Sequence, residues 1–139
     1  MSLQSAAIPY RTDASGRMEV LLVTSRTRRR WILPKGKIPA GMPPHHSAAR
    51  EAREEAGVIG AVSSSPVGEY HQVKAQADGE AVPVTVRAFP LAVERELRVW
   101  PEMEQRERCW MPIQHAIEQV NDPELRGVLE MFQQRSPRS

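Results

Sequence analysis

The chain has 139 residues, of which 40% are hydrophobic and 26% are charged, and its formal net charge at pH 7 is +2. This length suits one domain with a single core, so we expect residues 1–139 to form one domain. No apolar run approaches the roughly 20 residues of a membrane span, and no charged-then-apolar leader marks export, so the cytoplasm is the expected compartment. Cys109 is the single cysteine, which excludes an internal disulfide.

The basic residues are 16 Arg and 3 Lys. Arginine offers a planar fork that matches phosphate oxygens, although a GC-rich genome would give the same bias without any functional reason. Their position is more informative than their number, because the stretch SRTRRRWILPKGK, from Ser25 to Lys37, contains no acid. This stretch predicts a surface that holds a polyanion.

The first third of the chain predicts three strands, at residues 5–9, 19–25 and 31–33, with the turn sequence DASG between the first two. The stretch PKGKIPAGMPP that follows is so rich in Pro and Gly that it predicts a loop. A helix of about three turns should then begin at Pro44, which suits the first helical position. It should end before Gly57, which suits the residue after the last helical one.

The apolar face of this helix is nearly all alanine, and such small side chains predict a helix that lies close against a sheet. Its second half carries Glu51, Glu54 and Glu55. Glu51 and Glu55 stand four residues apart as a like-charge pair, and the last helical turn favours cations rather than acids. A bound divalent cation would reverse both penalties, whereas an ion pair of Arg50 with Glu54 would fit a solvated helix face. The pattern favours metal binding.

The remaining chain predicts strands at about 61–72 and 82–93, joined by a turn at ADGE, and a short strand at CWMPI. Asp122 and Pro123 should start a last helix that extends to about residue 134. Its core residues are expected at Leu125, Val128, Leu129 and Phe132, which recur at helical spacing. Strands, a helix, further strands and a final helix predict an α+β domain, layered around a mixed sheet.

The loop and central helix together resemble the Nudix box, whose pattern is Gly, five residues, Glu, seven residues, and Arg-Glu-apolar-x-Glu-Glu-x-Gly-apolar. Gly36, Arg50, Glu51, Ala52, Glu54, Glu55, Gly57 and Val58 match that pattern in type and spacing. Further stretches, AAIPYRTD, EVLLVTSR, RRWILPKG and WPEMEQRERCW, look like the diphosphoinositol-polyphosphate and diadenosine-polyphosphate hydrolase branch of the superfamily. The resemblance implies a MutT-like Nudix fold, with an α/β/α sandwich around a mixed sheet.

The resemblance also implies an enzyme in which a metal-activated water cleaves a phosphoanhydride bond. The partner would be a phosphorylated small molecule, of the nucleoside-diphosphate-linked or diphosphoinositol type. Mg²⁺ is the expected cofactor, with Mn²⁺ as a substitute, because a hard cation prefers carboxylates together with substrate phosphate and water. No feature of the sequence indicates an oligomeric state.

Carried over position by position, the resemblance assigns metal binding to Glu51 and Glu55, with the carbonyl of Gly36 as a backbone ligand. Glu54 matches the catalytic base, although family members differ over which acid does that work, and Glu54 could bind metal instead. One further metal ligand could come from the late loop, but no single acid there stands out. The three acids in question are Glu102, Glu104 and Glu107.

Substrate phosphates would be bound by Ser25, Arg26, Lys35 and Arg106, with Arg108 as a further phosphate ligand. For Arg106 and Arg108, a solvated strand edge is an equal alternative. One position departs from the box, because Met42 stands where the family has a Glu that pairs with the box Arg and holds the loop on the helix. The first strand also begins with SLQ, where the inositol branch has basic residues.

Two alternatives to the enzyme remain. A non-catalytic Nudix-fold module could bind a nucleotide or inositol phosphate without cleaving it, but a binder has no need of the strained acidic cluster. A nucleic-acid-binding module, suggested by Arg28, Arg29 and Arg30, ranks third, because the neighbouring acids would repel a phosphate backbone.

Overall fold

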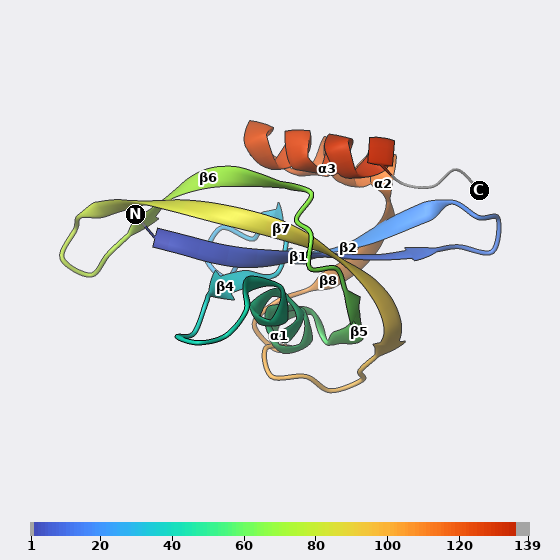
Figure 1. The fold of residues 1–139 in the computed structure, drawn as a ribbon, viewed down its shortest axis with the longest axis horizontal. Coiled ribbons are helices and arrows are strands. Elements are labelled where there is room, and N and C mark those ends of the chain that lie inside the picture. The colour runs from blue at the N-terminus through green and yellow to red at the C-terminus, as the bar shows by residue number, and fades with distance from the viewer. Residues whose placement is uncertain (1, 136–139) are drawn as a thin grey trace.

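The computed structural model describes residues 2–135. Its centre is a pair of long parallel strands, β1 (Ser2–Thr12) and β7 (Ala81–Glu96), which lie side by side in Figure 1. Residues 4–9 of β1 are all buried, because helices cover both faces of the sheet at this point. These two strands form the platform on which the other elements are arranged.

The remaining strands pair antiparallel with this platform or with each other, which makes the sheet mixed, as expected. The order along the main path is β3-β2-β1-β7-β5, with β4 paired to β1, β6 to β7 and β8 to β2. Their bounds are Met18–Thr24 for β2, Trp31–Ile32 for β3, Lys35–Lys37 for β4, Val58–Val62 for β5, Gly68–Ala75 for β6 and Arg108–Pro112 for β8.

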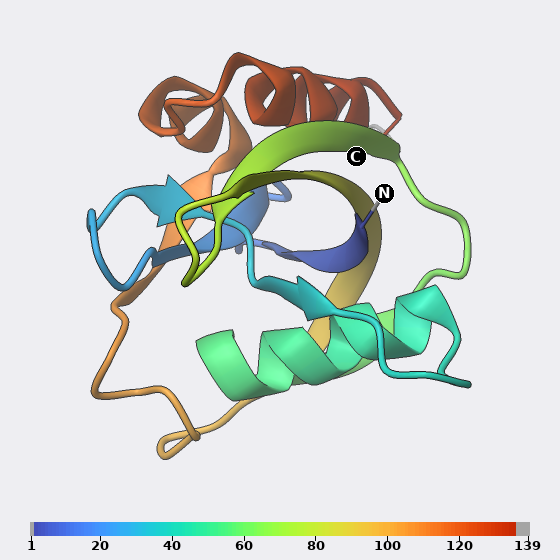
Figure 2. The same ribbon diagram turned by 90° about the vertical axis from the view of Figure 1, so that its left-hand side faces the viewer.

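Within residues 2–135, three helices cover the two faces of the sheet. Helix α1 (Pro44–Ala56) lies on one face, and α2 (Ile113–Gln119) and α3 (Pro123–Arg135) lie on the other, as Figures 1 and 2 show. Each face has its own cluster of buried apolar side chains. The α+β class and the α/β/α sandwich predicted from the sequence are therefore confirmed.

The ends of α1 and α3 follow from local chemistry. Pro44 occupies the start of α1, and Gly57 ends it in the left-handed conformation, with φ 67° and ψ 35°. Most side chains avoid that conformation and glycine does not. At the start of α3, the Asp122 carboxylate accepts a hydrogen bond of 2.9 Å from the backbone N–H of Glu124, which caps the helix as predicted.

The predicted elements were wrong in three places. The segment Lys35–Lys37, predicted as loop, forms strand β4 because it pairs with β1, in the register Gln4↔Lys37 and Ala6↔Lys35. The single strand predicted at 61–72 is two strands, β5 and β6, with Ser63 to Val67 between them. The strand predicted through Ile113 ends at Pro112, and α2, which was not predicted, begins at Ile113.

Candidate active site

The acids of α1 are positioned by the alanines beside them. Ala48, Ala52 and Ala56 are fully buried against the sheet, and small side chains let the helix backbone approach the strands closely. Glu55, on the same half of the helix, is only 7% exposed, whereas Glu51 is half-buried. Glu55 therefore lies inside the contact between the helix and the sheet, and Glu51 lies nearer its edge.

Gly36 provides space for one of these acids. It lies in β4 opposite Ser5 of β1. A Cβ atom at position 36 would stand 2.5 Å from Cδ of Glu51 and 2.6 Å from its Oε2, closer than nonbonded atoms approach. The pairing of β4 with β1 therefore brings the Gly36 backbone against the Glu51 carboxylate, and any larger residue would displace that acid.

Glu55 is held by two donors from different parts of the chain. Its Oε1 accepts a hydrogen bond of 3.1 Å from the backbone N–H of Lys35, and its Oε2 accepts one of 3.3 Å from Nη2 of Arg106. Burial raises the pKa of Glu55 to about 7, against the opposing effect of the Arg106 charge. Burial and the neighbouring Glu54 charge also raise the pKa of Glu51. Both raised pKa values mean that burial disfavours the charged forms of these two acids.

Glu54 points toward the more exposed side of α1. Its Oε2 accepts a hydrogen bond of 3.0 Å from Nε of Arg50, the i,i+4 pair expected from the sequence. Both side chains are at least one-third exposed, so the pair contributes at most about 1 kcal/mol to stability. The pair holds Glu54 at the rim of the carboxylate cluster.

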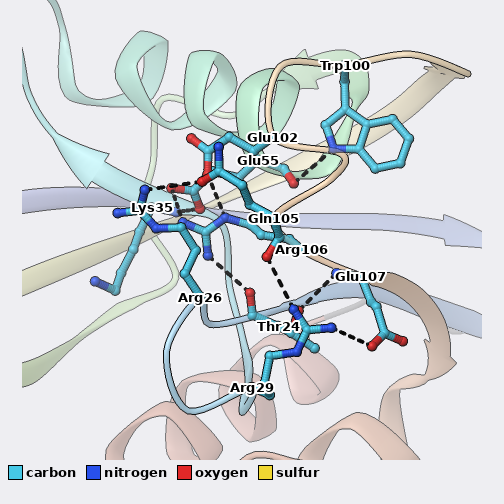
Figure 3. A network of polar contacts seen from close by, with 10 residues as sticks. All are labelled: Thr24, Arg26, Arg29, Lys35, Glu55, Trp100, Glu102, Gln105, Arg106 and Glu107. Carbon is cyan, nitrogen blue, oxygen red and sulfur yellow. Dashed lines mark hydrogen bonds and ion pairs between the residues drawn. The ribbon is translucent and has the colours of Figure 1, made fainter.

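Arg106 is the central cation of the site. Its Nε donates to Oε1 of Glu102 at 2.8 Å, its Nη1 donates to the carbonyl of Thr24 at 3.1 Å, and its Nη2 contacts Glu55. Figure 3 shows Lys35, Glu55, Glu102 and Arg106 converging on one region. The side chain of Arg106 is 8% exposed, so the solvated strand edge considered for it does not apply.

Two adjoining cavities open beside these residues. The first, of about 380 Å³, is lined by Gln4, Lys35, Gly36, Glu51, Glu55 and Arg106, among others. The second, of about 610 Å³, is lined by Ser25, Arg26, Arg28, Arg30, Gln72 and Arg106, among others. Arg26 and Arg106 line both, so the carboxylate cluster opens directly onto the basic stretch that the sequence singled out.

The residues predicted to bind substrate differ in their surroundings. Ser25 uses its Oγ to accept the backbone N–H of Arg30 at 3.0 Å, which closes the loop at the end of β2. Arg26 is exposed, and its Nη1 donates to Oε1 of Gln105 at 3.3 Å. Lys35 donates through Nζ to Oε1 of Gln4 at 3.3 Å, and burial lowers its pKa. All three side chains face a cavity.

Arg108, in contrast, lies outside both cavities. Its guanidinium donates to the carbonyls of Ala56, Gly57 and Leu97, at 2.8 to 3.2 Å, and stacks on the Trp100 ring at 3.9 Å. The N–H groups of Arg108 that make these hydrogen bonds are therefore used within the protein and not directed to a substrate. The geometry therefore gives Arg108 a structural contact at the end of α1 rather than a position beside the predicted phosphate ligands.

The last three carbonyls of α1 accept hydrogen bonds from residues between Trp100 and Arg108. The backbone N–H of Glu102 donates to the Glu54 carbonyl at 3.1 Å, and Nε1 of Trp100 donates to the Glu55 carbonyl at 3.2 Å. With the two bonds from Arg108, this segment caps the helix end. It also brings positive charge and donors to a helix terminus that carries partial negative charge, which offsets the acids placed there.

Sequence reasoning left the roles of Glu102 and Gln4 unassigned. Glu102 was one of three late acids that the sequence did not separate, and its contact with Arg106 singles it out. Gln4 is a buried polar residue, 5% exposed, beside Lys35. The polar Gln4 in a strand of mostly apolar residues could have indicated a functional role. Its partner Lys35, however, lies on β4, which was predicted as a loop.

The residues present fit a hard divalent cation. Glu51, Glu54 and Glu55 supply carboxylate oxygens, the donor type that Mg²⁺ prefers. The space above Gly36 that a Cβ would fill keeps the Glu51 carboxylate close to the backbone of β4. Within residues 2–135, however, no three His, Cys, Asp or Glu side chains are already arranged to hold a metal ion. Glu55 instead directs its oxygens to Lys35 and Arg106.

No helix among residues 2–135 is long and apolar enough to cross a membrane.

Known proteins match both the sequence and the fold. The family model described as NUDIX domain matches residues 1–132. Over 146 aligned residues, the chain is 30% identical to "Nudix hydrolase 13, mitochondrial" of Arabidopsis thaliana, which covers 94% of this chain and 72% of that protein. The Ap4A hydrolase of C. elegans, solved as a binary complex, superposes with a TM-score of 0.71 and 21% identity, over 96% of each chain.

A Nudix hydrolase from Nitrosomonas europaea has the same fold, with a TM-score of 0.74 and 18% identity over 96% of this chain and 88% of that one. At these identities, the two solved structures support the fold alone. The family itself follows from the domain model, which spans nearly the whole chain, and from the Arabidopsis relative. The chain therefore belongs to the Nudix family and is related to Nudix hydrolases, enzymes that act on pyrophosphate bonds.

Proposed function

We propose that this protein is a metal-dependent pyrophosphohydrolase that cleaves a phosphoanhydride bond in a phosphorylated small molecule. One observation carries the proposal: the carboxylates of Glu51 and Glu55 line the same cavity as Arg26, Lys35 and Arg106. A cavity that combines acids and bases suits a polyanion held beside a cation, because neither group of charges alone would favour both ligands. The family membership supports the same reaction class.

Glu51 and Glu55 would hold the metal ion, together with the carbonyl of Gly36, and Glu54 would join them as a ligand only if another group served as the base. Mg²⁺ is the proposed ion and Mn²⁺ a substitute. When bound, the ion supplies charge neutralisation and Lewis-acid polarisation of phosphate oxygens. The raised pKa of Glu55 supports this assignment, because burial disfavours an isolated carboxylate at this position and a nearby cation would favour it.

Residues of the chain would position the water, accept its proton and neutralise the phosphates during hydrolysis. The oxygen of a water molecule attacks one phosphorus, the bridging P–O bond breaks, and the oxygen that bridged the two phosphates leaves with the other phosphate. Glu54 would accept the proton of the attacking water, since its side chain is one-third exposed and its Arg50 contact is made at Oε2. Arg26 and Lys35 would neutralise the phosphates that are not attacked.

The substrate class proposed is a nucleoside-diphosphate-linked or diphosphoinositol-type molecule with several phosphates. The second cavity supports this choice, because Arg26, Arg28 and Arg30 all line it, next to the acidic cluster. Long-range attraction to so many cations favours ligands of high negative charge. We also keep the cytoplasm as the proposed compartment, although the Arabidopsis relative is named mitochondrial.

A substrate panel with and without Mg²⁺ tests the proposal. It should include dinucleoside polyphosphates, diphosphoinositol phosphates, nucleoside triphosphates and nucleotide sugars, with phosphate and nucleotide release as readouts. Glu51→Gln should lower turnover roughly 100-fold or more, because several kcal/mol of transition-state stabilisation depend on the metal. Glu130→Gln, an exposed acid on α3, is the matched control and should keep full activity. Binding without any release would favour the non-catalytic module instead.

A further inference from the structure

Arg106 occupies an unusual place for a substrate ligand, because its partners are two acids, one of which, Glu55, belongs to the proposed metal site. Its guanidinium contacts Glu102 at 2.8 Å and Glu55 at 3.3 Å, and all three side chains are at least three-quarters buried. An ion pair buried to this degree is costly to break on one side only, since the partner left behind is an uncompensated charge. Arg106 therefore neutralises the cluster in this state of the protein.

Glu55 is engaged through both of its oxygens. Oε1 accepts the Lys35 N–H, and Oε2 accepts the Arg106 guanidinium. A cation that binds Oε2 of Glu55 from the cavity must compete with Arg106 for that oxygen. Two cations held at one buried carboxylate oxygen repel each other, so a metal ion bound there should weaken the contact of Glu55 with Arg106.

Arg106 also lies where the two cavities meet. It lines the first together with Glu51 and Glu55, and the second together with Arg26 and Arg28. A guanidinium that leaves Glu55 therefore has the basic cavity next to it. Because an unpaired buried charge is costly, the released side chain needs a new anion, and a phosphate in that cavity would supply one.

We propose that Arg106 is an exchangeable counter-ion: it neutralises Glu55 and Glu102 when no metal is bound, and metal binding transfers it to a substrate phosphate. The inference rests on the proposed function, because it assumes the metal site described above. The exchange of Arg106 couples the binding of the metal ion to the binding of the substrate phosphate. Metal raises phosphate affinity by releasing Arg106, and by linkage, phosphate raises metal affinity by the same factor.

Calorimetric titration with Mg²⁺ in the absence of substrate tests the first half of the exchange. Arg106→Ala removes the competing cation, so Mg²⁺ should bind at least roughly tenfold more tightly than to the natural protein. Arg26→Ala is the matched control: it removes a charge from the same cavity that contacts Gln105 rather than a carboxylate. Equal gains in the two variants would reflect general electrostatics and would overturn the exchange.

Titration with methylenediphosphonate, a diphosphate analogue that hydrolysis cannot cleave, tests the second half. In the natural protein, saturating Mg²⁺ should raise the affinity for this anion, and the gain should be several-fold smaller in Arg106→Ala than in Arg26→Ala. The same gain in both variants would overturn the coupling. The signal does not depend on turnover, so it also reports on variants that have lost activity.

If Arg106→Ala does not fold, a second variant tests the same exchange. Glu102→Gln weakens the hold on Arg106 and should raise metal-free affinity for methylenediphosphonate more than Glu104→Gln, which neutralises an exposed acid in the same loop. Equal effects would overturn the exchange. Absence of Mg²⁺ binding in the natural protein would overturn the proposed metal site as well, whereas Mg²⁺ binding with equal Arg106→Ala and Arg26→Ala gains would overturn the exchange alone.

Discussion

The two faces of the central sheet are packed with different kinds of side chain. On the face covered by α3, the core contains large residues such as Ile8, Tyr70, Leu129 and Phe132. On the face covered by α1, the cluster has fewer members, and the helix contributes only alanines, against strand residues such as Leu21, Leu91 and Phe89. Apolar area removed from water scales with side-chain size, so the α3 face contributes more to stability.

The small side chains of α1 position the acidic residues of the helix against the sheet. A helix that lies close to the sheet can bury a carboxylate such as Glu55 beside Lys35 of β4, at a cost in desolvation. One face of the sheet therefore stabilises the fold, and the other positions charges. Substitutions on the first should change stability with little effect on the site, and those on the second should do the reverse.

The largest expected effect is on the α3 face. Leu129 is fully buried, so Leu129→Ala should lower the free energy of unfolding by about 3 kcal/mol, through lost burial and a residual cavity. Met131→Ala, on the same helix at 42% exposure, should cost far less. Urea unfolding measures both, and kcat of the folded protein should be unchanged. Equal losses for the two variants would contradict the assignment of the core.

The next effect concerns pH and the α1 face. The pKa of Glu55 is raised from 4.5 to about 7, so the folded protein binds a proton that the unfolded chain releases in this range. Stability of the metal-free protein should therefore fall as pH rises through this window, by at most about 3 kcal/mol for this group. Urea unfolding in the presence of a chelator, at several pH values, measures the loss.

Glu55→Gln is the control for this effect, because the amide cannot titrate. Its stability should vary less with pH between the same limits, and above pH 7 it should exceed that of the natural protein without metal. Parallel pH profiles for the two proteins would show that another group carries the dependence.

A smaller effect is expected at the rim of the cavities. Arg26→Ala should raise KM roughly tenfold for substrates with several phosphates, and less for simple diphosphates, because one charge-assisted hydrogen bond is lost. Its stability should be nearly unchanged, since the side chain is exposed. Arg87→Ala removes an exposed arginine that pairs with Glu69 outside both cavities, and its KM should not change. A uniform KM change across substrates of different charge would argue against phosphate binding by Arg26.

The smallest effect is expected at Met42, where the family pattern has an acid. Met42→Glu should give Arg50 a second partner and raise the melting temperature slightly, because an exposed ion pair contributes at most about 1 kcal/mol. Met42→Gln, which lacks the charge, should not. Turnover should change little. If the natural protein proved inactive and Met42→Glu restored turnover, the position would matter for catalysis and not only for the loop.

The sequence was sufficient where local chemistry decides the structure. Pro44 and Gly57 predicted the bounds of α1, and Asp122 predicted the start of α3, because caps and left-handed positions depend on neighbouring residues. The spacing of Glu51 and Glu55 likewise indicated a shared site. Two errors were also readable locally: the run from Ser63 to Pro66 signals a break between strands, and Ile113, Ala116 and Ile117 are spaced as on a helix.

The remaining features depend on contacts between distant segments. Strand β4 has a loop-like composition, and its pairing with β1 overrides that preference. Contacts with distant segments also decide the roles of Arg106 and Arg108, both of which were predicted from the sequence to bind phosphate. The Arg106 side chain contacts carboxylates, whereas the Arg108 side chain contacts backbone carbonyls. The two residues are only two positions apart, but their side chains reach different partners. Spacing along the sequence does not reveal such partners.

The capped end of α1 has a consequence for how the protein folds. Trp100 and Arg108 donate to carbonyls that lie 45 and 52 residues earlier in the sequence. Contacts of such separation require a long loop to close, which is slow relative to formation of the helix itself. During synthesis, α1 emerges well before these donors exist. We therefore expect the acidic cluster to acquire its final geometry late in folding, after β7 and β8 have joined the sheet.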